Sequence, residues 1–423
     1  MKSKIIIAGG GAAGMFASII AAEHGCEVHV FEKNEKLGKK LFITGKGRCN
    51  VTNACDDPEL FLGRVVTNRR FLYSAFYGFS NLDMIRFLEN HGLTLKVERG
   101  QRVFPASDKS SDVIRLLSDL MKEKGVKVYL NTPVRRILTE DGRVCGAELD
   151  DGRRESADAV ILACGGVSYP QTGSDGDGFR MAGELGHSCT KLSPSLVPLV
   201  TQESWCHEIQ GLSLKNVTLT LRQGKKQVYQ EFGEMMFTHF GITGPIVLGA
   251  STCVQKYLKK GYLEARIDLK PALTEKQLDE RVLRDFAEVP NRQLRNALDK
   301  LLPKSLILPV IEVSGNDAFA VVHDLTKASR LALVHTIKDL PLTVTDTRGF
   351  SEAIITQGGI PVKEVMPDSM ASRFTKGLYF AGEMLDVDAV TGGYNLQIAW
   401  STAFAAGNAA AEYAYEMREK TGE

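Results

Sequence analysis

The chain has 423 residues, of which 43% are hydrophobic and 24% charged, and its formal net charge is +1. This length predicts two or three domains, and the near-zero charge argues against nucleic acid or an anionic membrane as a partner. No apolar stretch is long enough to span a bilayer. The N-terminus is basic and then apolar, as a signal peptide would be. Its glycines follow a fixed pattern that a signal peptide does not require, so we favour a folded segment here.

The eight cysteines are scattered along the chain without a CxxC pair. In a chain of this size that pattern is typical of reduced thiols in the cytoplasm. We therefore expect a cytoplasmic protein, and we find no spacing of residues typical of a metal site.

A dinucleotide-binding pattern begins with the first predicted strand, at residues 4–8. The sequence of residues 9–14 is GGGAAG, which contains GxGxxG, and a helix is predicted to follow over 15–24. A second strand is predicted over 27–31, and Glu32 comes directly after it. Strand, glycine turn, helix and acidic strand end together predict the site that binds the ADP half of a dinucleotide.

Each residue of this pattern has a physical task. Gly9 permits the tight turn, Gly11 lets the backbone approach a pyrophosphate, and Gly14 lets the helix pack close to the strand. The helix N-terminus attracts the diphosphate, and Glu32 would accept hydrogen bonds from the ribose hydroxyls. The expected cofactor contacts here are Gly9, Gly11, Ala12, Ala13, Gly14, Glu32 and Lys33.

Two further segments favour FAD over NAD. The loop 44–53 is glycine-rich and cationic, and it is long enough to wrap a pyrophosphate. The predicted strand 378–383 is followed by Asp386, Asp388 and a helix start at Gly392, an order that suits a ribityl chain and a flavin ring. The expected contacts are Lys40, Leu41, Gly45, Asn50, Val51, Thr52, Gly382, Glu383, Asp388, Gly393, Asn395 and Leu396.

The middle of the chain changes character. A strand is predicted over 159–166, whereas residues 216–221 and 264–269 alternate between apolar and polar side chains. Alternation indicates antiparallel strands with one buried face, as in a barrel. Thr274 to Gln277 matches a capping box at the start of a helical segment. No second GxGxxG unit follows, so NAD(P)H is expected only as a transient electron donor.

Four stretches of sequence carry a family resemblance. The chain closely resembles bacterial flavoproteins named NAD(FAD)-utilising dehydrogenases or aminoacetone oxidase family FAD-binding enzymes, a family that includes a clostridial bile-acid reductase. The stretches are GKGRCNVTN, ILACGGVSYPQTGSDGDGF, MMFTHFGITGP and GLYFAGEMLDVDAVTGGYNLQIAWSTA. The resemblance implies a backbone contact near Val134 with the adenine, and the strand that ends at Gly165 resembles the Ala-Thr-Gly signature of such flavoproteins, with Cys164 in place of the threonine. We predict that the FAD is bound noncovalently.

The resemblance also implies a domain arrangement of the α/β class. A discontinuous Rossmann-like FAD-binding domain would be interrupted by an inserted β-barrel domain and a small helical subdomain. The expected boundaries are 1–193 with 357–423 for the FAD-binding domain, 194–272 with 323–356 for the barrel, and 273–322 for the helical subdomain.

Catalytic residues are less explicit in the sequence. Cys49 and Cys55 lie where disulfide reductases of this fold carry a redox pair, but five residues separate them, one more than in those enzymes. Structural or flavin-adjacent thiols fit that spacing better. His239 is a candidate acid or base near the flavin. A histidine that is only hydrogen-bonded at a domain junction would have the same neighbouring residues. Tyr169 and Tyr394 are candidate proton donors, although tyrosines beside glycines more often pack.

Three functions remain open from the sequence. The first is an NAD(P)H-dependent reductase of a conjugated C=C bond in a small molecule, such as a 3-oxo steroid or bile acid, a substrate class that comes only from the resemblance. The second is an oxidase that takes hydride from an amine and passes electrons to oxygen. The third is a flavin-binding sensor or RNA-associated protein. The oligomeric state is expected to be monomer or homodimer.

Overall fold

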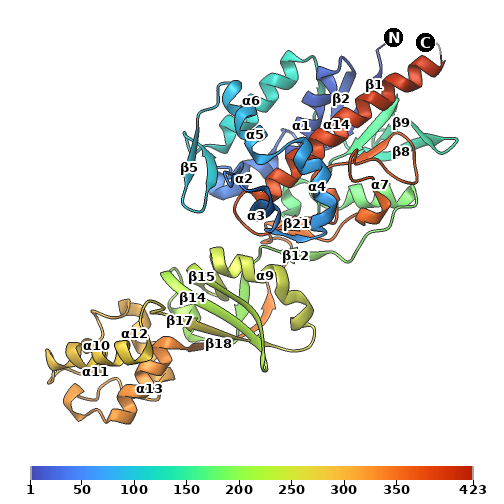
Figure 1. The fold of residues 1–423 in the computed structure, drawn as a ribbon. Coiled ribbons are helices and arrows are strands. Elements are labelled where there is room, and N and C mark those ends of the chain that lie inside the picture. Colours follow the sequence, from blue (N-terminus) through green and yellow to red (C-terminus); the bar gives the residue numbers. More distant parts are fainter. Residues whose placement is uncertain (1, 422–423) are drawn as a thin grey trace. The chain divides into compact units, whose positions relative to one another are not determined.

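In the computed structural model, which describes residues 2–421, the chain divides into two units (Figure 1). The first unit is made of residues 1–195 and 350–423, and the second of residues 196–349. The first unit therefore contains both ends of the chain. The helical segment expected as a separate subdomain packs into the core of the second unit, and its independence stays a prediction.

A five-stranded parallel sheet forms the centre of the first unit. Its strands are, in spatial order, β20 (Leu378–Phe380), β11 (Ala159–Leu162), β1 (Lys4–Ala8), β2 (Glu27–Phe31) and β7 (Lys127–Tyr129). Ile5, Ile6 and Ile7 of β1 are fully buried, because a central parallel strand is covered on both faces. The carboxyl ends of all five strands lie along one edge, where this type of sheet binds its ligands.

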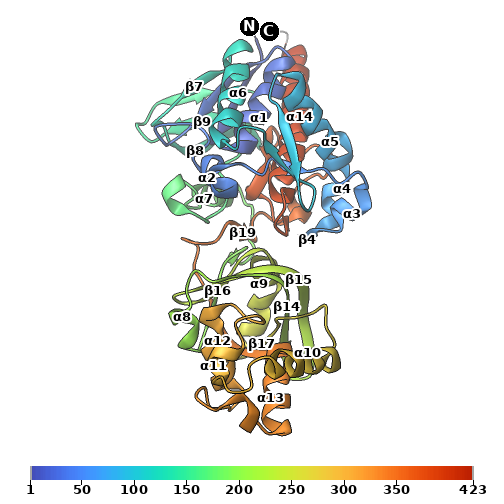
Figure 2. The same cartoon turned by 90° about the vertical axis from the view of Figure 1, so that its left-hand side faces the viewer.

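Three helices pack together beside this sheet: α1 (Ala12–Glu23), α6 (Ser110–Glu123) and α14 (Tyr394–Thr421). Figure 2 shows α14, at the C-terminal end of the chain, running beside α1 at the N-terminal end. The two helices cross closely at Gly407, where an added Cβ would lie 2.9 Å from the carbonyl oxygen of Ala17. The first and last elements of the chain therefore share one core.

Smaller elements surround the sheet. A three-stranded antiparallel sheet lies against β11 through β9. The strands are β8 (Val134–Glu140), β9 (Arg143–Leu149), β10 (Arg154–Ser156), β3 (Thr52–Asn53), β5 (Leu95–Glu98), β6 (Arg102–Pro105), β4 (Val65–Thr67), β21 (Asp388–Ala389), β12 (Ser193–Ser195) and β19 (Ile355–Gln357). The helices are α2 (Lys39–Gly47), α3 (Pro58–Leu62), α4 (Arg69–Gly78), α5 (Asn81–Asn90), α7 (Asp177–Glu184), η1 (Pro170–Thr172), η3 (Val362–Glu364) and η4 (Gly382–Met384).

The second unit is built on a closed barrel of six antiparallel strands. The strands are, in spatial order, β13 (Leu199–Thr201), β16 (Gly241–Thr243), β15 (Lys226–Thr238), β14 (Ser213–Gln223), β17 (Leu263–Asp268) and β18 (Leu340–Thr347). Leu219, Ala265 and Ile267 are fully buried, as the alternating pattern predicted. Closure of the barrel leaves no free strand edge.

Helices complete the second unit. They are α8 (Trp205–Glu208), α9 (Pro245–Leu258), α10 (Glu275–Ala287), α11 (Leu294–Ala297), α12 (Lys304–Val313), η2 (Val322–Asp324) and α13 (Lys327–Lys338). The predicted capping box at the start of α10 is confirmed, because the Thr274 side chain accepts from the Gln277 backbone N–H while the Gln277 side chain accepts from that of Thr274.

The fold confirms the predicted class: a Rossmann-type α/β domain drawn from both ends of the chain, with an inserted barrel. Local boundaries differ from the prediction at two places. Helix α1 begins at Ala12, and an unpredicted helix, α2, begins at Lys39 and breaks at Thr44, where the expected loop starts. None of the helices within residues 2–421 is both long and apolar enough to cross a bilayer.

Candidate functional site

The glycine turn between β1 and α1 leaves open space at the carboxyl edge of the sheet. Gly9 has a φ of +104°, and an added Cβ there would lie 2.6 Å from the Ala163 carbonyl oxygen. A Cβ at Gly14 would clash with the Gly9 carbonyl oxygen, whereas a Cβ at Gly11 would have no atom within 4 Å. Gly11 is the N-cap residue of α1 and provides no side-chain cap. The free backbone N–H groups of the first turn of α1 therefore face a hollow suited to an anion.

Glu32 lies beside this turn and is almost fully buried. One carboxylate oxygen accepts from the Gly10 backbone N–H at 2.7 Å, and the other accepts from the backbone and side chain of Asn34 at 2.8 and 2.6 Å. These bonds hold the carboxylate at the end of β2, where the sequence placed the ribose contact. The Lys33 ammonium points elsewhere, because it pairs with Asp175 at 2.6 Å and Asp177 at 2.8 Å.

A hydrogen-bonded network joins α2 to the end of β20. The Lys40 ammonium donates to Glu383 Oε2 and to Ser168 Oγ, both at 2.6 Å. The other oxygen of Glu383 accepts from the Ser168 hydroxyl at 2.9 Å and from the Thr356 backbone N–H at 2.7 Å. Lys40 and Glu383 were predicted from the sequence, whereas Ser168 and Thr356 were missed because no local pattern marks them.

The loop after α2 is held in an unusual backbone conformation. Gly45, Lys46, Gly47 and Cys49 all have φ values between +58° and +83°, the left-handed region that favours glycine. The Asn50 side-chain oxygen is buried and has no hydrogen-bond partner among the described residues. Such a buried acceptor requires a donor, and an amide or hydroxyl of a bound cofactor would supply one.

The same loop meets the start of α14. The Trp400 indole N–H donates to the Val51 carbonyl oxygen at 3.0 Å, and the Thr52 hydroxyl donates to Gln397 Oε1 at 2.8 Å. A Cβ at Gly393, whose φ is +98°, would clash with the Thr52 backbone. Segments more than three hundred residues apart in the sequence therefore lie in direct contact.

Asp388 is the other buried carboxylate of this region, at 1% exposure. Its Oδ1 has no partner in the described part of the chain, and its Oδ2 lies 3.4 Å from the Gln357 side-chain nitrogen. Desolvation raises the pKa of Asp388 to about 6, and the nearby charges of Asp386 and Glu383 act in the same direction. The carboxyl group thus offers an acceptor that the protein itself leaves unused.

The remaining predicted contacts lie along the same edge. Asn395 uses its side chain to bond the backbone of Ala389, at 2.8 and 2.9 Å, so it fixes the turn before α14. Gly382 has a φ of +69°, and an added Cβ would lie 2.9 Å from Ala13 Cβ. The other predicted contacts are Ala12, Leu41, Val134, Gly165 and Leu396, of which Leu41 and Val134 are buried.

The residues of this edge fit FAD. The hollow at Gly11 suits a diphosphate and Glu32 lies at the expected ribose position, while Asn50 and Asp388 present buried oxygens without partners. An extended cofactor with phosphates at one end and amide and hydroxyl donors at the other would satisfy these groups. The role of each residue as a cofactor contact stays a prediction.

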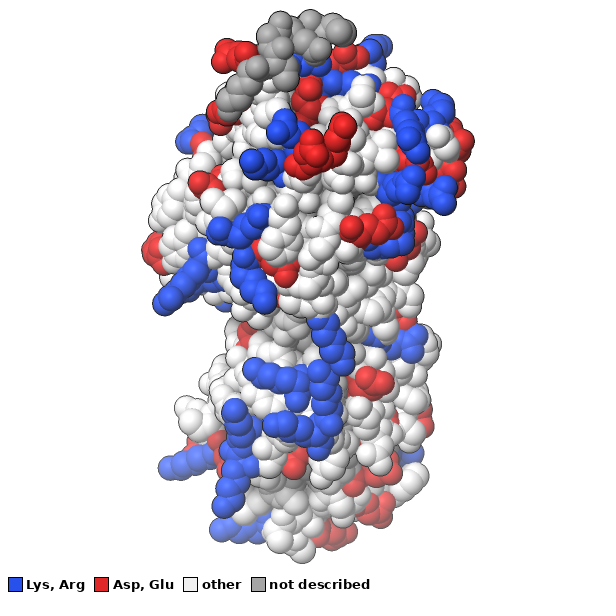
Figure 3. All heavy atoms as spheres, turned by 90° about the vertical axis from the view of Figure 1, so that its right-hand side faces the viewer, with Lys and Arg blue, Asp and Glu red and all other residues white. Residues whose placement is uncertain are grey.

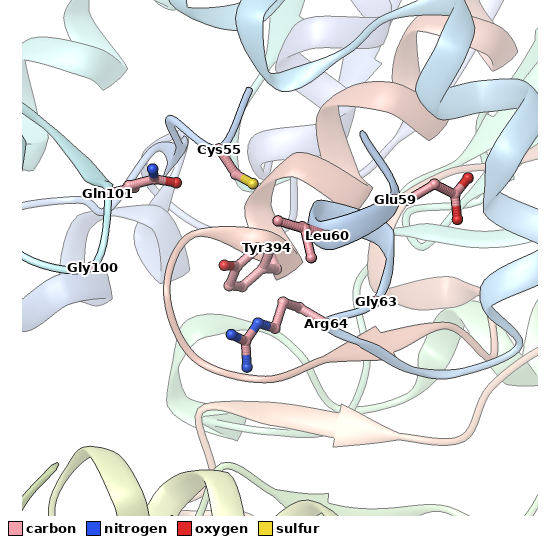
Figure 4. A pocket seen from close by; sticks show the side chains of 8 residues that line it. All are labelled: Cys55, Glu59, Leu60, Gly63, Arg64, Gly100, Gln101 and Tyr394. Atoms are coloured by element: carbon pink, nitrogen blue, oxygen red, sulfur yellow. The ribbon is translucent and has the colours of Figure 1, made fainter. Parts of the chain in front are cut away.

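A pocket of about 440 Å³ borders the start of α14 (Figure 4). The side chains of Arg64 and Tyr394 lie beside each other there. Burial raises the pKa of Tyr394, and the charge of Arg64 opposes that rise. The lining residues are Cys55, Glu59, Leu60, Gly63, Arg64, Gly100, Gln101 and Tyr394.

The other catalytic candidates differ in their surroundings. Cys49 is fully buried, and desolvation raises the pKa of its thiol to about 12, which makes it a poor nucleophile. Cys49 and Cys55 are both free thiols. His239 belongs to the second unit, where it is exposed between β15 and β16, and its catalytic role stays a prediction. Tyr169, in the first unit, is half-buried and does not line the pocket.

Comparison with known proteins agrees with this geometry. A 3-dehydro-bile acid delta(4,6)-reductase of Clostridium scindens is 34% identical over 414 residues, which are 97% of this chain and 99% of that one. A ribosomal RNA dihydrouridine synthase of Escherichia coli K12 is 30% identical over 403 residues, 95% of this chain and 96% of that one. The solved structure of a Rhodococcus jostii 3-ketosteroid-delta4-(5alpha)-dehydrogenase superposes with a TM-score of 0.55 at 17% identity, over 97% of both chains, and thus shares the fold.

A family model of the HI0933-like protein Rossmann domain matches residues 3–409. This match spans both units and includes every residue of the edge described above. The chain therefore belongs to the HI0933-like Rossmann domain family, and it is an FAD-dependent oxidoreductase.

Proposed function

We propose that this enzyme reduces a carbon–carbon double bond conjugated to a carbonyl group, with NAD(P)H as the electron donor. The observation that carries the proposal is the pocket at the start of α14, where the side chains of Arg64 and Tyr394 lie beside each other. Reduction of such a bond adds a hydride to one carbon and a proton to the next. A phenol beside a cationic side chain is suited to adding the proton.

The named activities of the relatives involve the same type of bond. A Δ4 double bond beside a 3-keto group and the 5,6 double bond of uracil are both conjugated to a carbonyl. The two curated relatives therefore support one chemistry even though their substrates differ. We favour a 3-oxo steroid or bile-acid-like substrate, because the bile-acid reductase has the higher identity and the pocket volume falls within the roughly 300–1,000 Å³ of small-molecule sites.

The residues of the first unit would divide the work as follows. The glycine turn and Glu32 would hold the adenosine diphosphate end of FAD, and Asn50 and Asp388 would bond its other half. FAD, when bound and reduced, supplies the hydride. Tyr394 would donate the proton into the pocket.

Arg64 would stabilise the resulting phenolate because its positive charge, beside Tyr394, already favours the ionised phenol. The phenolate would then recover its proton from solvent through the pocket mouth. Leu60 would supply the less polar part of the lining.

A second candidate substrate is uridine within RNA. The Escherichia coli relative, at 30% identity over nearly the whole chain, favours it. The chemistry in the pocket would be unchanged, but the reacting uridine would be part of a polyanionic RNA chain that the protein must also bind. The two candidates therefore differ in what the rest of the protein surface must bind.

An anaerobic two-step experiment tests the proposal. Holoenzyme is mixed with NADH or NADPH, and loss of flavin absorbance is followed. The reduced enzyme is then mixed with 4-androstene-3,17-dione or with a uridine-containing RNA, and return of the absorbance is followed. We expect bleaching by a nicotinamide and recovery with one of the two acceptors. Bleaching by small amines but not by nicotinamides would instead establish the oxidase, and no bleaching by either would favour a sensor.

Tyr394→Phe separates proton donation from the rest of the reaction. We expect the nicotinamide step to be unchanged and the acceptor step to slow by about 100-fold, the usual contribution of a general acid. Tyr77→Phe, an exposed tyrosine on α4, is the matched control. An equal effect of Tyr394→Phe on both steps would show that Tyr394 acts by supporting the structure.

A further inference from the structure

Six cationic side chains gather on one face of the second unit. Arg222, Lys225 and Lys226 lie at the β14–β15 turn, and Lys256, Lys259 and Lys260 lie at the end of α9; all six are exposed. Tyr257 joins the two groups, because the ammonium groups of Lys226 and Lys256 lie 5.4 and 5.2 Å from the centre of its ring. We call these six side chains and Tyr257 the Tyr257 cluster.

The turn and the helix end are also bonded to each other directly. The Gln223 side chain donates to the Tyr257 carbonyl oxygen at 3.0 Å. The cationic groups of the turn are therefore held beside those of the helix by the fold itself. Their proximity does not depend on the conformation of long side chains.

Several other cations of the same unit have acidic partners, whereas those of the Tyr257 cluster have none among the described residues. Elsewhere, Arg281 pairs with Asp285 at 2.8 Å, Arg330 with Asp279 at 2.7 Å and Lys338 with Asp268 at 2.6 Å. Within the described chain, no carboxylate pairs with any of the six. Glu264 lies opposite Arg222 in the sheet, but it pairs with Arg266 instead.

Compensation of the helix dipole explains only part of this arrangement. Lysines at the end of α9 stabilise the negative end of that helix. The same effect does not explain three more cations on a neighbouring hairpin. Bringing six like charges together without counter-charges raises the energy of the folded unit, so a polyanion that neutralises them would bind favourably.

We propose that the Tyr257 cluster binds single-stranded RNA. Figure 3 shows Lys and Arg side chains gathered on the second unit with few acidic side chains among them. The cations would contact phosphates, and Tyr262, which is 60% exposed and follows Lys260 by two residues, offers a ring for stacking on a base. Cations combined with exposed aromatic rings are the usual means of binding single strands. The proposal deepens the second candidate function, on which it rests, by naming a surface that would hold the RNA.

The number of charges sets the expected dependence on salt. Six phosphate contacts predict a slope of log K against log [salt] of about −4 for a single strand. Affinity should then fall about 250-fold between about 50 and 200 mM salt. Notably, the net charge of the whole chain, +1, gives no hint of this local surface.

The test measures binding of a fluorescein-labelled oligouridylate to holoenzyme by fluorescence anisotropy over a series of salt concentrations. The variant Lys256→Gln/Lys259→Gln/Lys260→Gln removes half of the cluster, and we expect its salt slope to be weaker by about 2. The matched control, Lys276→Gln/Lys304→Gln/Lys327→Gln, changes three exposed lysines of the same unit outside the cluster. Its affinity and slope should equal those of the wild type.

A second variant tests the stacking contact. Tyr262→Ala should weaken RNA binding by about tenfold without changing the salt slope, because it removes a ring but no charge. Flavin absorbance confirms that each variant remains loaded with FAD.

Three outcomes would overturn the proposal: no RNA binding, equal loss in the cluster variant and the control variant, or binding to vesicles of phosphatidylserine but not to RNA. The assay contains no reductant and no turnover, so RNA binding can fail while the reductase reaction succeeds. RNA binding without any reductase reaction would support the RNA-binding surface and reject the proposed chemistry.

Discussion

The buried carboxyl of Asp388 makes the stability of the first unit depend on pH in an unusual direction. Its pKa is raised from 3.8 to about 6, chiefly by desolvation. Between these two values the folded chain holds a proton that the unfolded chain has released. The free energy of unfolding therefore falls as the pH rises from about 4 to about 6.

The size of the effect follows from the shift. A difference of about 2 pK units corresponds to about 3 kcal/mol, and Asp388 is buried deeply enough for solvent screening to be small. Asp388→Asn removes the ionisable group and retains its shape. The variant and the wild type are compared without FAD. We expect them to be about equally stable near pH 4, and we expect the variant to be more stable than the wild type by up to about 3 kcal/mol at pH 8.

Tryptophan fluorescence can measure the free energy of unfolding of the first unit alone. The chain has two tryptophans: Trp400 is buried in the first unit and Trp205 belongs to the second. In a Trp205→Phe background, urea unfolding followed through Trp400 reports the unit that contains Asp388. Asp56→Asn, an exposed carboxylate of the same unit, is the control. A difference between Asp388→Asn and wild type that is the same at pH 4 and pH 8 would refute the reasoning.

Further predictions concern the carboxyl edge of the sheet. Gly14→Ala should abolish FAD retention after gel filtration because its Cβ clashes with the Gly9 carbonyl, whereas Gly183→Ala, which meets no atom within 4 Å, should retain it. Glu32→Gln should weaken FAD binding by about 10- to 100-fold in a fluorescence titration, because it replaces a charged acceptor; unchanged affinity would contradict the ribose assignment. In native protein, iodoacetamide should modify the exposed Cys189 but not Cys49, whose thiol pKa is about 12; equal labelling would contradict that burial.

The features that the sequence predicted well are those that local periodicity determines. The strand 4–8, the glycine turn and Glu32 follow one another within the chain, and their pattern specifies their geometry without help from distant residues. The alternation in 216–221 likewise predicted a barrel strand because one face of such a strand is buried.

The features that the sequence did not predict depend on contacts between distant segments. Ser168 meets Glu383 because β11 and β20 are neighbours in the sheet, and Thr356 reaches Glu383 from β19. Arg64 reaches Tyr394 from another element, and nothing in its own sequence surroundings distinguishes it from other surface arginines. The helical start of α2 at Lys39 was also missed, because so few residues precede the break at Thr44 that they show no clear periodicity.

The crossing of α1 and α14 at Gly407 sets an order of events during synthesis of the chain. The inserted unit has neighbouring ends, since Leu199 pairs with Thr347, so it can finish folding before the residues that follow it are made. The parallel sheet cannot, because β20 and α14 follow the inserted unit in the sequence. FAD can therefore be captured only after α14 has been made, and a chain cut before α14 would contain a folded barrel attached to an incomplete, flavin-free first unit.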